Sequence, residues 1–125
     1  MSYFLTINRI SCIVQDDYTG QDEIYVRVPT GTVLWVGGWV RSYTNNTILM
    51  GWFRSGGGWQ TIGKMLELPE DQSLIYIWEK DVVNADDYLG RIDAASIVGR
   101  SSVIIPLSIS GGARYNFDVD CDQTP

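Results

Sequence analysis

Tyr115-Asn116-Phe117-Asp118-Val119 alternates apolar and polar side chains, and Ile75-Tyr76-Ile77-Trp78 alternates β-branched and aromatic ones. A period of two residues is that of a β-strand with one face in a core and the other toward solvent. Both segments therefore predict strands of an antiparallel sheet.

Further runs rich in β-branched and aromatic residues lie between turn signals on both sides of these two segments. The expected strands are Tyr3–Ile13, Glu23–Val28, Thr32–Tyr43, Ile48–Phe53, Lys64–Leu68, Ser73–Trp78, Ser102–Ser108 and Ala113–Val119. Short strands at this spacing are typical of a sandwich or barrel. Only Asp93–Gly99 has a helical pattern, for a turn or two, with Gly99 as its stop. We predict an all-β fold, an eight-stranded antiparallel β-sandwich.

Length and composition limit the classes of protein to which this chain can belong. The 125 residues, 45% of them apolar, fit one domain over residues 1–125 with its own core. The net charge of −6, with nine scattered Lys and Arg, repels phosphate backbones, so we expect no nucleic-acid partner. No basic leader and no long apolar stretch is present, so we expect neither a signal peptide nor a transmembrane segment.

The chain contains no histidine. This removes the commonest general base, the usual zinc ligand and the Ser-His and Cys-His nucleophile pairs. The remaining route to catalysis is a pair of carboxylates, as in glycosidases, but that mechanism needs two acids flanking a cleft. We expect a binding protein without enzymatic activity.

Cys12 and Cys121 lie near opposite ends of the chain and leave two alternatives open. In an oxidising compartment they could form one disulfide that closes most of the chain into a loop, which would indicate an extracellular protein. The other alternative is two buried free thiols, which would fit a cytoplasmic one.

Two acidic clusters follow strand-like runs, one at Asp16–Glu23 and one at Glu79–Asp87. Acidic loops are often only solvated turns, since Asp and Asn favour turns. So many like charges are unfavourable unless something neutralises them, and calcium prefers six to eight oxygen ligands in flexible geometry. Two such loops at one end of a sandwich predict a calcium site.

The same segments resemble a known family. Ile75–Asp81 followed by Asp86–Ile92 is similar to the strand and third calcium loop of the C2 domain, a calcium- and phospholipid-binding β-sandwich, and Asp16–Val28 resembles its first calcium loop and next strand. Glu79 stands where that family has Asp, Ile24 where it has Pro, and the Lys-rich strand of the family has no counterpart.

The resemblance implies a C2-like fold and a set of calcium ligands. The ligand candidates are Asp16, Asp17, Asp22, Glu23, Glu79, Asp81 and Asp87, with Gly90 as the tight turn after the second loop. Bound calcium would then engage a phospholipid head group, a glycan or a protein partner.

Tryptophans within a Gly-rich stretch support a second hypothesis. Exposed Trp on Gly-rich loops could stack on sugars or enter a lipid interface, and Trp39 and Trp59 are the candidates for ligand binding. For Trp35 and Trp52 we favour a place in the core. The alternatives to a calcium-dependent module are thus a carbohydrate-binding module or lectin, and a structural interaction module of a toxin or adhesion assembly.

Overall fold

The computed structural model describes residues 1–16, 20–43, 46–81, 85–109 and 112–123. Within these residues it contains ten strands and one short helix. They are β1 (Tyr3–Val14), β2 (Asp22–Arg27), β3 (Val33–Val36), β4 (Trp39–Tyr43), β5 (Thr47–Phe53), β6 (Trp59–Leu68), β7 (Leu74–Lys80), β8 (Asp87–Asp93), the 3₁₀ helix η1 (Ala94–Ile97), β9 (Arg100–Ser108) and β10 (Arg114–Gln123).

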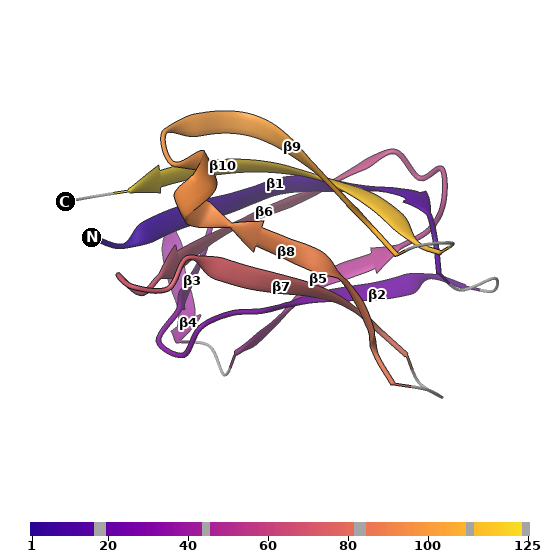
Figure 1. Ribbon diagram of the computed structural model, residues 1–125, viewed down its shortest axis with the longest axis horizontal. Coiled ribbons are helices and arrows are strands. Elements are labelled where there is room, and N and C mark those ends of the chain that lie inside the picture. Colours follow the sequence, from indigo (N-terminus) through magenta and orange to yellow (C-terminus); the bar gives the residue numbers. More distant parts are fainter. Residues whose placement is uncertain (17–19, 44–45, 82–84, 110–111, 124–125) are drawn as a thin grey trace.

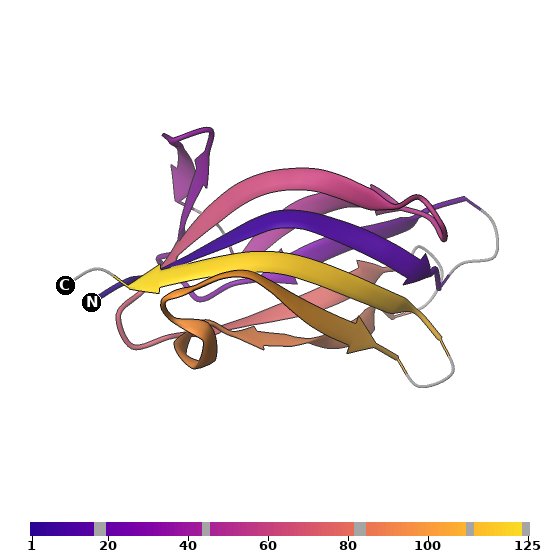
Figure 2. The ribbon, with the colours of Figure 1, turned by 90° about the horizontal axis from the view of Figure 1, so that it is seen from above.

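The strands form two antiparallel sheets that pack face to face (Figures 1 and 2). One sheet has the order β4-β3-β6-β1-β10-β9 and the other β5-β2-β7-β8. Both sheets contribute to one buried cluster, with Leu5 and Phe117 from the first and Ile24 and Ile77 from the second fully buried. The prediction of an all-β fold of two packed antiparallel sheets is confirmed.

The expected number of eight strands is wrong, for two local reasons. The segment predicted as one strand, Thr32–Tyr43, is a hairpin of β3 and β4, because Gly37 and Gly38 take positive φ values of 62° and 81° and reverse the chain. The strand β8 is absent from the predicted set, since its Gly90 and its charged residues weaken the strand signal. It pairs with β7 nonetheless, through the register from Leu74↔Asp93 to Glu79↔Asp87.

The expected turn of helix is present as η1. The Asp93 side chain accepts a hydrogen bond from the Ala95 amide at 3.1 Å and so caps the first turn. Gly99, with φ of 81°, follows the helix and leads into β9.

A line of β-bulges crosses the larger sheet at the level of Asn8. Asn8 interrupts the register of β1 with both β6 and β10, so that Leu5 and Ile7 before it and Ile10 and Cys12 after it all point into the core. The Asn8 amide donates to Asp118 at 3.3 Å and to Asp120 at 3.0 Å, which fixes the bulge from β10. The strands of this sheet are strongly arched (Figure 2).

The two cysteines are buried free thiols, so the disulfide alternative is not realised. Cys12 pairs with Tyr115, and Cys121 pairs with Leu5, seven residues back along β1. At about 3.3 Å per residue that separation is roughly 23 Å, far beyond the ~7 Å limit for a disulfide.

Among the described residues, no helix is long and apolar enough to cross a lipid bilayer.

Candidate functional site

Four pairs of consecutive strands have their adjoining ends at one end of the sandwich, on the right in Figure 1: β1 and β2, β5 and β6, β7 and β8, and β9 and β10. The two acidic segments of the sequence lie between the strands of the first pair and between those of the third. The strand pairing β2–β7 brings them together, because β2 begins where the first segment ends and β7 ends where the second begins. Two loops that are about sixty residues apart in the chain thus share one end of the fold.

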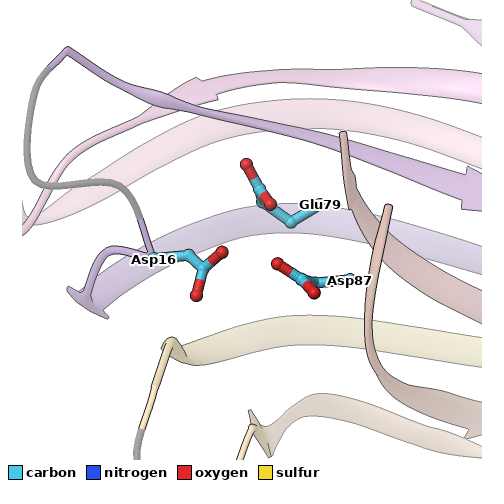
Figure 3. Close-up of side chains that lie close together, drawn as sticks. All are labelled: Asp16, Glu79 and Asp87. Atoms are coloured by element: carbon cyan, nitrogen blue, oxygen red, sulfur yellow. The ribbon is translucent and has the colours of Figure 1, made fainter. Parts of the chain in front are cut away.

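Three carboxylates converge there (Figure 3). Asp16, Glu79 and Asp87 each offer one oxygen, and these oxygens all lie within 4.8 Å of one another. Asp16 follows β1 of the larger sheet, whereas Glu79 and Asp87 face each other as a register pair across β7 and β8 of the smaller one. We call these three residues the carboxylate cluster. It combines residues from both sheets and lies at the end of the sandwich described above.

The three carboxylates of the cluster are shielded from solvent to different degrees. Glu79 is fully buried, and Asp16 and Asp87 are partly buried. A hydrogen bond with Asp87, desolvation and the charges of Asp87 and Asp22 together raise the pKa of Asp16 to about 6, against a smaller lowering effect of Glu79. The cluster therefore gathers carboxylate oxygens in a confined space, and such oxygens are the ligands that a hard cation prefers.

Asp22 is close to the carboxylate cluster but is held by the protein. It is fully buried, and its Oδ2 accepts hydrogen bonds from the Asp16 amide at 2.7 Å and from the Tyr115 hydroxyl at 2.6 Å. These contacts fix the backbone at Asp16 against β10. In this arrangement Asp22 holds the backbone of the candidate ligand Asp16 in position.

Asp86 is not among the predicted ligands, yet it links the end of β7 to the start of β8. Its Oδ1 accepts from the Asp81 amide at 3.0 Å, and its Oδ2 accepts from the Tyr25 hydroxyl at 2.5 Å. The Tyr25 bond is the main cause that lowers the pKa of Asp86. An Asp that bonds a nearby backbone amide is a common loop device, but its partner Tyr25 lies 61 residues away and no local signal points to it.

The remaining predicted ligands lie elsewhere. Glu23 points to the outer face of the smaller sheet, where its Oε1 accepts from the Trp52 indole at 3.2 Å and its Oε2 lies 3.9 Å from Lys80 Nζ. Asp81 is partly buried and, unlike its neighbour Glu79, is not one of the three clustered carboxylates. Asp17 falls outside the described residues.

The tryptophans are distributed over separate surfaces. Trp39, 72% exposed, lies in the β3–β4 hairpin that projects from the body in Figure 2. Trp59, 40% exposed, begins β6 at the loop end, where the Arg9 guanidinium lies 4.3 Å from its ring centroid. Trp52 is half-exposed, so the expectation of a core position for it is wrong; Trp35 is partly buried and donates to Glu67 at 3.1 Å.

The β5–β6 loop is tied to the segment that carries Asp16. The Gln15 amide donates to Ser55 Oγ at 2.8 Å, and the Ser55 amide donates to Gln15 Oε1 at 3.0 Å. Trp52 and Trp59 flank this loop on either side. The carboxylate cluster and two exposed tryptophans therefore share one end of the molecule.

Comparison with models of known protein families finds no match for this chain, and comparison with curated protein sequences finds none either.

Proposed function

We propose that this protein is a C2-like, non-catalytic binding module that holds calcium in the carboxylate cluster of Asp16, Glu79 and Asp87. The observation that carries the proposal is the convergence of these oxygens within 4.8 Å, from the loop after β1 of one sheet and from the paired strands β7 and β8 of the other. A cation between them would offset a repulsion that the fold otherwise has to tolerate.

Calcium fits the donor set best. The cluster offers carboxylate oxygens alone, and three carboxylates supply up to six oxygens, the lower end of the coordination number of calcium. The chain has no histidine, and soft metals prefer nitrogen or sulfur ligands. Magnesium prefers a smaller, stricter octahedron with several waters, so it serves as the control cation.

A calcium ion at the end of a sandwich can complete its coordination with an oxygen from outside the protein. We propose that this oxygen comes from a membrane lipid or a protein partner. Trp52 and Trp59, 50% and 40% exposed at the same end, support contact with a lipid interface, where the amphipathic indole is favoured.

The absence of enzymatic activity is part of the proposal. Glycosidase carboxylates face each other across a sugar-sized cleft. Here the three acids surround one point, and the described cavities lie elsewhere, on the outer face of the smaller sheet and beside Trp52.

Thermal unfolding in EDTA and during a calcium titration tests the site. A ligand at about 100 times its Kd adds about 2.7 kcal/mol to the free energy of unfolding, a shift of several degrees in Tm. We expect calcium to raise the Tm and magnesium at the same concentration to raise it less. An Asp16→Asn variant should lose the response, whereas Asp122→Asn, an exposed acid on β10, should keep it.

Sedimentation with vesicles then separates the two kinds of partner. Calcium-dependent binding to phosphatidylserine vesicles, lost in Asp16→Asn, indicates a lipid. Calcium-dependent stabilisation without vesicle binding indicates a protein partner. A Tm that is the same in EDTA and in millimolar calcium contradicts the proposed function.

A further inference from the structure

The outer face of the smaller sheet carries an ordered array of aromatic and charged side chains. The strand registers place these side chains in three rows across the strands. From β5 outward the rows are Trp52–Glu23–Lys80, then Leu49–Tyr25–Trp78–Tyr88, then Thr47–Arg27–Tyr76–Arg91. The middle row is largely aromatic, and the rows on both sides of it are rich in charged and hydroxyl groups.

Two rings on this face are exposed, whereas Tyr25 is buried and Trp78 is partly buried. Tyr76 and Tyr88 are 38% and 44% exposed. The ring of Tyr88 lies 5.1 Å from that of Trp78 and 6.3 Å from that of Tyr76, and the Arg27 guanidinium lies 5.0 Å from the Trp78 ring centroid. These contacts hold the rings in place before any ligand arrives, which lowers the entropic cost of binding.

Two adjacent hollows lie on this face and share Arg27. One, of about 320 Å³, lies over Tyr25 and is bounded by Leu49, Lys80 and Asp86. The other, of about 340 Å³, lies beside Tyr76 and is bounded by Pro29, Asp71 and Gln72. Both volumes are within the range of small-ligand sites.

The charges around the two hollows nearly cancel. Arg27 and Lys80 stand against Glu23, Asp86 and Asp71. A polyanion would meet three carboxylates there, and a polycation two bases, so neither is favoured. The face is thus best suited to an uncharged ligand that can use many hydrogen-bond donors and acceptors.

Several of these polar groups are already oriented. The Trp52 indole and Lys80 hold Glu23, and the Tyr25 hydroxyl holds Asp86. A pyranose ring shows C–H bonds on its face and hydroxyls on its rim. A sugar ring stacked on Tyr76, the exposed ring that bounds one hollow, would direct its hydroxyls toward Arg27 and Asp71 of the same hollow.

We propose that the outer face of the smaller sheet binds a neutral oligosaccharide of at least two sugar units, one in each hollow, with Arg27 donating hydrogen bonds to both. This site is separate from the carboxylate cluster and does not depend on the proposed calcium function. It also differs from a glycan site at Trp39 or Trp59, which lie on the larger sheet.

A panel of neutral mono- to hexasaccharides and their uronic-acid counterparts, screened in EDTA and followed by calorimetry on the best binder, tests the proposal. We expect neutral oligosaccharides to bind in EDTA, longer ones more tightly than the monosaccharide. Binding of acidic glycans alone, binding only with calcium, or no binding at all would overturn it. Calcium-dependent binding would instead place the glycan at the carboxylate cluster.

Variants locate the site. Tyr76→Ala and Arg27→Ala should each weaken binding at least tenfold, while the matched changes on the larger sheet, Trp59→Ala and Arg100→Ala, should leave it within twofold. Thr47→Arg fills the hollow over Tyr25 from an exposed position, so it should block binding even if an alanine variant fails to fold. Loss in Trp59→Ala with retention in folded Tyr76→Ala and Thr47→Arg would refute the assignment.

Discussion

Glu79 lies directly opposite Asp87 across the antiparallel pair of β7 and β8. Like charges in facing positions of a sheet destabilise it by about 0.2–1 kcal/mol, and here the Asp16 carboxylate approaches both. We therefore expect this end of the fold to govern how the protein responds to calcium and to pH.

Removing one charge of this pair should have opposite effects with and without calcium. We expect Asp87→Asn to raise the free energy of unfolding in EDTA by about 0.2–1 kcal/mol, because repulsion from Glu79 is relieved. The same variant should lose most of the stabilisation by calcium. Urea unfolding in both conditions measures this, with Asp122→Asn as the matched control. An Asp87→Asn variant that is less stable in EDTA but equally responsive to calcium would refute the prediction.

The pKa of Asp16, raised to about 6, predicts the pH dependence. The folded state holds this proton more tightly than the unfolded state, so the contribution of Asp16 to apo stability increases as pH falls from about 6 toward 4. Calcium competes with the same proton, so its apparent Kd should rise about tenfold between pH 7 and pH 5. Calorimetry at both values, in buffers of different ionisation enthalpy, measures the affinity and the proton released. A Kd that does not change with pH would show that Asp16 is not a ligand.

The Tyr115 hydroxyl stabilises the buried Asp22 carboxylate. Tyr115→Phe removes this donor from a fully buried acid, and we expect a loss of about 1–3 kcal/mol in the free energy of unfolding. Tyr88→Phe, on an exposed ring, should change stability by less than about 0.5 kcal/mol. Calcium affinity of the Tyr115→Phe variant should also fall, because Asp22 holds the backbone of Asp16. Equal stability of the two variants would show that the bond contributes nothing net.

Gly90 packs against Leu107 of β9. A Cβ added at Gly90 would lie 2.8 Å from Leu107 Cδ2, at a φ of 150° that L residues rarely adopt. We expect Gly90→Ala to cost about 1–3 kcal/mol, and the cost to be smaller in a Leu107→Ala background, where the clash is absent. A double-mutant cycle by urea unfolding gives this coupling. Strict additivity would mean that backbone strain alone, and not the side-chain contact, explains the glycine.

The sequence predicts the strands well where alternation is strict. Ile75 and Ile77 are buried and Tyr76 is exposed, as the period of two requires. It fails where glycines act on the backbone: Gly37 and Gly38 divide one predicted strand, and nothing in the apolar pattern of Thr32–Tyr43 indicates the reversal.

The sequence identifies the acidic segments that form the candidate site, but not which of their residues come together. The acidic segments could be identified from their charge density, yet of the six candidate ligands within the described residues only three cluster, because of contacts that are remote in sequence. Asp22 bonds Tyr115, 93 residues away, and Glu23 bonds Trp52 on the opposite face of the sheet. Such partners depend on the packing of the whole fold and leave no local signal.

The bulge at Asn8 changes which residues of β1 face the core. The core-facing positions of β1 are odd-numbered before Asn8, at Leu5 and Ile7, and even-numbered after it, at Ile10 and Cys12. The arch of the sheet therefore corresponds to a one-residue shift in the hydrophobic period of β1. Asp118 and Asp120 on β10 stabilise the bulge by accepting hydrogen bonds from Asn8. Deleting Asn8 would restore an unbroken period in β1 but would enlarge the mismatch with β6, where Ile62 and Gly63 lie between the partners of Ile7 and Arg9, so the two neighbouring strands encode the arch together.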